Sequence, residues 1–231
     1  MNVVLFDIDG TLISTRGGGK RAMQAALREH FGTSGPDSYR YDGKTDRQIA
    51  RELMREAGFD DATIDARMAS VIEHYLTGLR GDLARAEEPH VYPGIHALLD
   101  ALEARHDVMI GLLTGNVEPG AHAKLSAAKL APARFRVGAF GSDHERRDEL
   151  PEIARARAAA LLERELAGNA LVIIGDTPND LTCGKRVGAR AIGVATGSYT
   201  EEALSAHAPW AVFADLSDTA RVLAAILRAA A

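Results

Sequence analysis

The chain has 231 residues, 46% of them hydrophobic and 26% charged, and this balance excludes a disordered chain. The formal net charge is −5, whereas nucleic-acid-binding proteins have an excess of basic residues. No apolar run is long enough to cross a bilayer. We therefore expect neither nucleic acid nor a membrane as a partner. We expect no secretory leader in the first residues, and the lone cysteine, Cys183, allows no internal disulfide. We therefore expect a cytoplasmic protein.

Six short apolar runs, each bounded by turn residues, recur along the chain. They are continuously apolar, as strands are when helices cover both faces of a parallel sheet. The predicted strands span residues 3–6, 108–113, 137–140, 171–174, 191–194 and 211–213. Helical patterns lie between them. One begins with Pro93 in its first turn, and another begins at Pro151 and is expected to stop at Gly168. Strand alternating with helix predicts an α/β fold with a doubly wound parallel sheet.

Residues 15–90 interrupt this alternation. They contain helical patterns over 20–31, 46–57 and 61–79 and no convincing strand. Gly17–Gly19 opens the segment, and we expect a flexible hinge there, with a plain surface loop as the alternative. The prediction is therefore two units, a core of residues 1–14 and 91–231 and a small all-helical domain of residues 15–90.

The first strand is followed by Asp7-Ile8-Asp9-Gly10-Thr11-Leu12. Ligands of open α/β sheets bind beyond the carboxyl ends of the strands, which is where both carboxylates should lie. Two carboxylates about 4 Å apart repel by roughly 4 kcal/mol at an effective dielectric near 20, so a cation or a proton must sit with them. An EF-hand loop is excluded, because its sixth and twelfth positions, glycine and glutamate, are occupied here by Leu12 and Gly18.

A second acidic cluster follows the strand at 171–174, in the sequence Gly175-Asp176-Thr177-Pro178-Asn179-Asp180. Parallel strands bring their carboxyl ends to one edge, so Asp176 and Asp180 should meet the first pair there. A capped surface turn is the alternative for this segment taken alone. Four carboxylates at one edge predict a site for Mg²⁺, with the metal set Asp7, Asp9, Asp176 and Asp180.

The strand at 108–113 leads into Thr114-Gly115-Asn116, a hydroxyl and amides that form a small anion cradle or an ordinary turn. We expect a basic residue that binds a phosphoryl oxygen between Asn116 and Gly175. The candidates there are Arg146 and Arg147, which follow a predicted strand. We expect no other fixed cation in the site. An exposed, solvated arginine pair is the alternative.

These motifs, in this order, resemble those of the haloacid dehalogenase-like hydrolase superfamily. The long helical insertion after the first motif is similar to the cap of its phosphoglycolate phosphatase-like branch. The resemblance implies a Rossmann-like core, Mg²⁺ dependence and hydrolysis of a small phosphorylated metabolite, of the phosphoglycolate or sugar-phosphate type, through an aspartyl-phosphate. A phosphomutase of the same fold stays open as the alternative. A dehalogenase or an inactive binding protein is disfavoured by Asp9 and by the intact acidic positions. The oligomeric state is not predicted.

The resemblance also implies roles. Asp7 is the nucleophile, and Asp9 protonates the leaving oxygen and later deprotonates water. Mg²⁺ is held by Asp7, by the backbone carbonyl of Asp9 and by Asp176, with Asp180 in support. The phosphoryl group is held by Thr114, Gly115, Asn116 and Arg147. Many relatives carry Lys-Pro where this chain has Arg146-Arg147, and Arg147 is preferred because it lies nearer the helix at Pro151. Residues 41–46 are a candidate substrate-facing loop, although Thr45 or Asp46 could simply cap the next helix.

Overall fold

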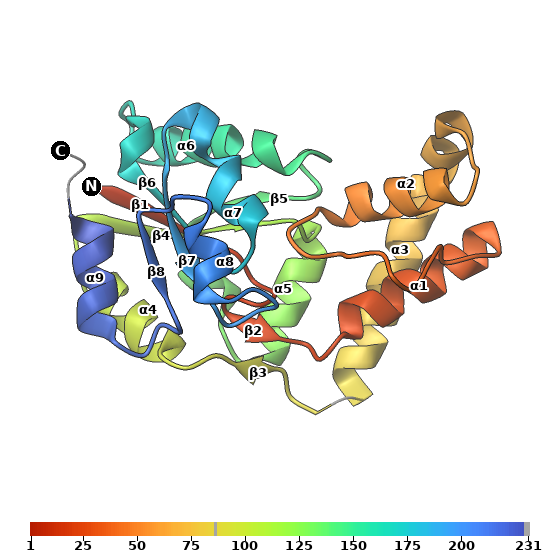
Figure 1. Ribbon diagram of the computed structural model, residues 1–231, viewed down its shortest axis with the longest axis horizontal. Helices are drawn as coiled ribbons and strands as arrows, with labels where there is room; N and C mark the ends of the chain where they lie inside the picture. Colours follow the sequence, from red (N-terminus) through yellow and green to blue (C-terminus); the bar gives the residue numbers. More distant parts are fainter. Residues whose placement is uncertain (86, 229–231) are drawn as a thin grey trace.

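The computed structural model describes residues 1–85 and 87–228 and has a six-stranded parallel sheet at its centre (Figure 1). The strand order is β5-β4-β1-β6-β7-β8. These strands are β1 (Asn2–Phe6), β4 (Val108–Thr114), β5 (Val137–Phe140), β6 (Leu171–Gly175), β7 (Arg190–Val194) and β8 (Ala211–Phe213). All six predicted strands are present, with ends that differ by at most one residue, and the α/β, Rossmann-like fold class is confirmed.

Helices cover both faces of the sheet, which explains why the strands are apolar throughout. In β1, Val4 and Phe6 pack on one face, and Val3 and Leu5 pack on the other. The first face is covered by α4 (Ile95–Glu103), α5 (Glu118–Ala127) and α9 (Thr219–Leu227). The second is covered by α6 (Leu150–Leu161), α7 (Pro178–Cys183) and α8 (Glu201–Ser205). In Figure 1, α6 lies above the sheet and α4 and α5 lie below it.

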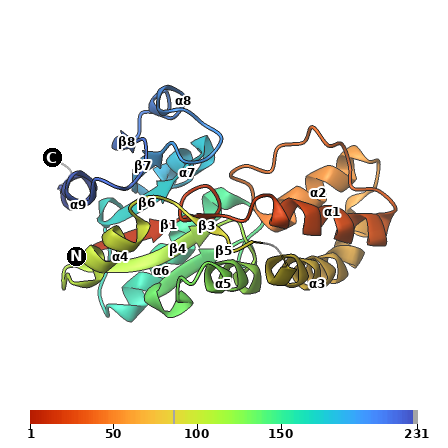
Figure 2. The same ribbon diagram turned by 90° about the horizontal axis from the view of Figure 1, so that it is seen from below.

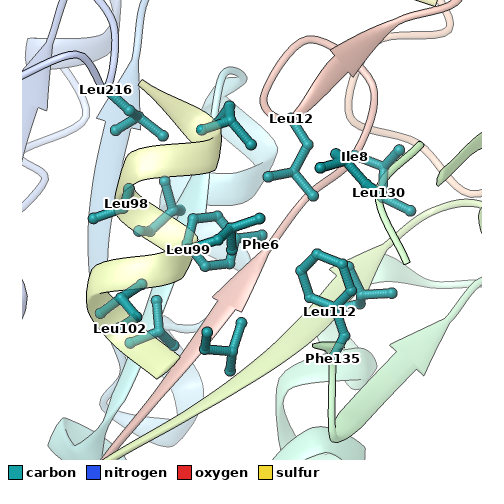
Figure 3. Close-up of a cluster of buried hydrophobic side chains, with 14 of the residues drawn as sticks. Phe6, Ile8, Leu12, Leu98, Leu99, Leu102, Leu112, Leu130, Phe135 and Leu216 are labelled. Carbon is teal, nitrogen blue, oxygen red and sulfur yellow. The ribbon is translucent and has the colours of Figure 1, made fainter. Parts of the chain in front are cut away.

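The packing of α4 on β1 shows how the spacing of apolar residues builds this core (Figure 3). Leu98, Leu99 and Leu102 belong with Phe6 to one apolar cluster, and all four are fully buried. Each such side chain contributes roughly 1.5–3 kcal/mol through burial. The helix begins at Ile95, and its N-cap is Gly94, which has a positive φ of 84°. Pro93 therefore precedes the helix, and the prediction that it lies in the first turn is wrong.

The expected stop of α6 at Gly168 is also wrong. The helix ends at Leu161, and Glu163 then takes a left-handed conformation with φ of 51°. The backbone N–H of Arg164 donates to the carbonyl of Ala159 and closes the helix end. A glutamate in this conformation carries no sequence signal, whereas a glycine after a helical pattern predicts a helix end.

Three helices lie together at one side of the sheet in both views (Figures 1 and 2). They are α1 (Gly18–Phe31), α2 (Asp46–Glu56) and α3 (Asp61–Arg85), and we call them the helical unit. They share an apolar cluster of their own, which Val117 joins from the loop before α5. The chain leaves and returns through a short antiparallel pair, β2 (Ile13–Ser14) and β3 (His90–Val91).

The glycines that open the helical unit are part of α1. Gly17 is its N-cap with φ of 82°, and Gly18 and Gly19 form its first turn. The expectation of a flexible hinge and the alternative of a surface loop are therefore both replaced by a helix start. Among the described residues, no helix combines the length and apolar character that crossing a membrane requires.

Candidate active site

Two acidic residues lie side by side because their strands are neighbours in parallel register. Phe6, the last residue of β1, pairs with Ile174 of β6, so Asp7 and Asp176 both follow directly at the carboxyl edge. The N–H of Asp7 donates to the carbonyl of Ile174 at 2.9 Å, and this hydrogen bond holds the segments that follow β1 and β6 side by side. The two acidic motifs, which lie more than 160 residues apart in sequence, therefore meet at one edge of the sheet.

Asp180 joins them through the start of α7. The hydroxyl of Thr177 caps this helix by accepting from the N–H of Asp180, and the Asp180 carboxylate accepts from the N–H of Thr177 at 3.0 Å. Carboxylate oxygens of Asp7, Asp176 and Asp180 lie within 4.8 Å of one another, and all three side chains are buried. Burial raises the pKa of Asp7 to about 6, against the lowering effect of Arg147. Burial, with Asp180 and Asp7 nearby, raises the pKa of Asp176 well above its ordinary value.

This acidic group has the chemistry of a site for a hard divalent cation. Its donors are carboxylate oxygens, which Mg²⁺ prefers. Burial raises the pKa of Asp7 and Asp176, and the neighbouring carboxylates raise both pKa values further. Room around Asp176 comes from two glycines: a Cβ at Gly10 or Gly197 would lie 2.3 Å or 1.8 Å from one of its carboxylate oxygens. The residues fit the metal expected from the sequence.

Of the two candidate arginines, Arg147 reaches this group. Its side chain is buried, its guanidinium lies 3.2 Å from Asp7 Oδ1, and it also forms an ion pair with Asp180. Arg146 instead points outward, with a side chain 67% exposed, and pairs with Asp148 at 2.6 Å. The exposed-pair alternative therefore describes Arg146 and not Arg147.

Asn116, two residues after the end of β4, links Thr114 to the other motif residue, Asp9. The amide of Asn116 donates to Thr114 Oγ1 and to Asp9 Oδ2, each at 2.8 Å. Gly115 has a further role, because its carbonyl accepts from the N–H of Asp46 in the helical unit at 2.8 Å. A Cβ at Gly115 would lie 2.0 Å from the carbonyl oxygen of Lys44, so glycine allows the two backbones to approach.

Lys124 is a site residue that the sequence reasoning missed. Its ammonium is buried on α5 and donates to Asp9 Oδ2 and Asn116 Oδ1, each at 2.6 Å. The expectation of no other fixed cation in the site is therefore wrong. The available signal was its place in the buried stripe of α5, with Gly120, Ala121 and Leu125, where an unpaired lysine would be costly.

The helical unit closes over these residues through the loop of residues 41–46. Asp46 Oδ2 accepts from the N–H of Val117 at 2.8 Å, and Asn179 donates to the carbonyl of Gly43 at 3.0 Å. Thr45 caps α2 by accepting from the N–H of Gln48, and it also donates to the carbonyl of Glu145 at 2.6 Å. The capping alternative is therefore confirmed for Thr45. The loop also lines the cavity at the site, and its contact with a substrate stays a prediction.

A cavity of about 540 Å³ lies between the sheet edge and the helical unit. Its lining includes the site residues Asp7, Asp9, Thr114, Gly115, Asn116, Lys124, Arg147 and Asp176, and from the helical unit Lys20, Met23, Tyr41, Lys44, Asp46 and Tyr75. Asp180 does not line it, because it lies behind Arg147 and the acidic group and is fully buried. A cavity of this size is typical of sites for small molecules.

Comparisons with known proteins agree with this geometry. A family model described as haloacid dehalogenase-like hydrolase matches residues 1–188. The chain is 33% identical over 222 residues to a 5'-nucleotidase of Pseudomonas aeruginosa, and the aligned region covers 95% of this chain and 94% of that protein. It is 30% identical over 230 residues to a phosphoglycolate phosphatase of Rhodospirillum rubrum, with coverage of 93% and 87%. A solved hydrolase of Pseudomonas syringae, 21% identical, superposes with a TM-score of 0.71 over 99% of this chain and 100% of that one. The order of the motifs along the sheet edge and the match of the family model show that this chain belongs to the haloacid dehalogenase-like hydrolases.

Proposed function

We propose that this protein is a Mg²⁺-dependent phosphatase that hydrolyses a small phosphorylated metabolite through an aspartyl-phosphate on Asp7. The observation that carries the proposal is the setting of the Asp7 carboxylate. It belongs to an acidic group suited to a divalent cation, and together with Thr114 and Asn116 it lines a cavity of about 540 Å³. The activities named for the two relatives, 5'-nucleotidase and phosphoglycolate phosphatase, are both hydrolyses of phosphate monoesters and support the same conclusion.

Mg²⁺ would be held by the carboxylates of Asp7 and Asp176 and by the backbone carbonyl of Asp9, with Asp180 in support. Bound there, it would neutralise the repulsion between the carboxylates and a phosphoryl group. Arg147 already compensates part of the charge of Asp7 and Asp180. Four carboxylates with Arg147 and Lys124 have two formal negative charges in excess, which matches one divalent cation.

The residues of the chain supply the remaining chemistry. An oxygen of Asp7 attacks phosphorus, the bond to the leaving oxygen breaks, and Asp9 gives that oxygen a proton. Water then attacks the phosphorus of the aspartyl-phosphate, passes a proton to Asp9 and releases Asp7 and inorganic phosphate. Thr114, Gly115 and Asn116 bind the phosphoryl oxygens, and Arg147 orients the Asp7 carboxylate. The helical unit limits the access of water to the intermediate.

A substrate panel tests this function. Phosphoglycolate, sugar phosphates and nucleoside 5'-monophosphates are incubated with the protein in Mg²⁺ or in EDTA, and phosphate release is measured. We expect hydrolysis of at least one ester in Mg²⁺ and none in EDTA. Phosphate release that persists in EDTA would contradict the metal dependence. Isomerisation of a sugar phosphate without release of phosphate would instead establish the phosphomutase.

A further inference from the structure

Lys124 is a buried charge that none of the sequence motifs contains. Its side chain is 5% exposed, and it projects from the inward face of α5 among Gly120, Ala121 and Leu125. A lysine ammonium loses several kcal/mol of hydration on burial, so a fold that keeps one there has partners for it. Its position at the cavity places those partners in the site.

The partners of Lys124 converge on one oxygen of Asp9. The ammonium lies 2.6 Å from Asp9 Oδ2, and the amide of Asn116 lies 2.8 Å from the same oxygen. Lys124 also donates to Asn116 Oδ1 at 2.6 Å, which sets the orientation of that amide. Asp9 Oδ1 accepts no hydrogen bond from any described residue. The Asp9 side chain, which is 40% exposed, is thus held through Oδ2, and Oδ1 is left for a substrate or a water molecule in the cavity.

Room for this ammonium is provided by the helical unit. A Cβ at Gly19, in the first turn of α1, would lie 3.2 Å from Lys124 Nζ. Lys124 also lowers the pKa of Asp46, which burial otherwise raises. Lys124 therefore lies where α5, α1 and the acid–base residue meet.

We propose that Lys124 is the positioning residue of Asp9, and that it fixes Oδ2 so that Oδ1 is the oxygen that exchanges a proton with the leaving group and then with water. This inference rests on the proposed phosphatase function. In the first half-reaction, an oxygen of Asp7 forms a bond to phosphorus while the bond between phosphorus and the leaving oxygen breaks. The electron pair of the broken bond stays on the leaving oxygen, and the proton of Asp9 Oδ1 moves to it. Asp9 is left as a carboxylate that already faces the ammonium of Lys124 and the amide of Asn116, so no reorganisation is needed.

The test compares two esters that differ in their need for a proton. An alkyl phosphate has a poor leaving group that requires protonation, whereas p-nitrophenyl phosphate has a good one that does not. We expect Lys124→Met to lower kcat/KM, which reports the step that forms the aspartyl-phosphate and releases the leaving group, by about 100-fold on the alkyl ester and by less than about 5-fold on p-nitrophenyl phosphate. Lys185→Met, which removes an exposed lysine of the sheet-bearing part, is the matched control and should leave both rates unchanged.

A double variant shows whether Lys124 acts through Asp9. If it does, Asp9→Asn with Lys124→Met is no slower on the alkyl ester than Asp9→Asn alone. Equal losses in kcat/KM on both esters, or losses that multiply in the double variant, would overturn the proposal and leave Lys124 a structural charge. Lys124→Gln, which keeps a hydrogen-bond donor, is used if thermal unfolding shows that the methionine variant does not fold. A wild type that hydrolyses no ester would refute the proposed function itself, which is a different outcome.

Discussion

The sheet edge and the helical unit meet around one cavity, but different forces hold them together. At the sheet edge, buried carboxylates are fixed by strand register and by Arg147. The helical unit has its own apolar cluster, which, of the residues that the structure describes, only Val117 joins from the sheet-bearing part. Polar contacts also hold it to the sheet edge: those of residues 43–46 and the ion pair of Arg51 with Glu145 at 2.6 Å. Apolar packing is cooperative and dense, whereas a few hydrogen bonds each contribute about 1 kcal/mol. The chemistry thus belongs to the rigid part, and access to it depends on contacts that are easier to break.

The largest expected effect is at the sheet edge. Asp7→Asn removes the nucleophile, because an amide oxygen does not form the aspartyl-phosphate, and should lower phosphate release at least about 1000-fold. The melting temperature should be unchanged or higher, since burial disfavours the charge of Asp7. Activity assays and thermal unfolding check this. Activity equal to that of the wild type would refute the nucleophile assignment.

The arginine pair provides the next test, because its members differ in burial and not in charge. Arg147→Ala leaves Asp7 and Asp180 without their cation, which should cost about 3–5 kcal/mol of unfolding free energy and most of the activity. Arg146→Ala, its matched control, removes an exposed ion pair and should cost under about 1 kcal/mol. Denaturant unfolding and kcat/KM are measured for both. A larger loss in Arg146→Ala would show that the wrong arginine was chosen.

A glycine in the helical unit tests the contact between the two regions. Gly43 has φ of 69°, and a Cβ there would lie 2.5 Å from Thr177 Oγ1. Gly32 has φ of 75° with nothing near its Cβ position. Alanine at either site should cost roughly 1–3 kcal/mol of backbone strain, but Gly43→Ala alone should displace the loop and lower kcat/KM about 10- to 100-fold. Equal kinetics in the two variants would show that this contact does not govern access.

The last test concerns Asp46, whose carboxylate joins the helical unit to Val117, and it is followed through stability and not through activity. Burial raises its pKa from an ordinary 3.8 to about 6 in the folded protein. The folded state therefore holds the proton more tightly, and stability falls as pH rises between these values. Asp46→Asn keeps an oxygen that accepts the hydrogen bond, and because asparagine does not ionise, its stability does not fall with pH for this reason. Its stability relative to wild type should improve by up to about 3 kcal/mol from about pH 4 to about pH 7. A difference that does not change with pH would contradict a buried charge at this position.

Particular residues show where sequence reasoning succeeded and failed. The six strands were predictable, because continuous apolar runs reflect a sheet covered on both faces. Asp7 and Asp176 were expected to be neighbours because their strands end at a common edge. The helix boundaries near Pro93 and Gly168 were missed, because Gly94 and Glu163 set them through backbone conformations that have no unique residue signal. Lys124 was missed because a lone lysine on a helix is usually exposed.

The sequence by itself determined the fold class, the family and the carboxylates at the ends of β1 and β6, because strand pattern and local motifs follow from residue order. Tertiary structure decided which arginine is buried, that Lys124 reaches Asp9, and that Gly115 receives the backbone of the helical unit. These contacts join segments far apart in the chain, and their geometry follows from how helices pack on the sheet, which no local pattern specifies.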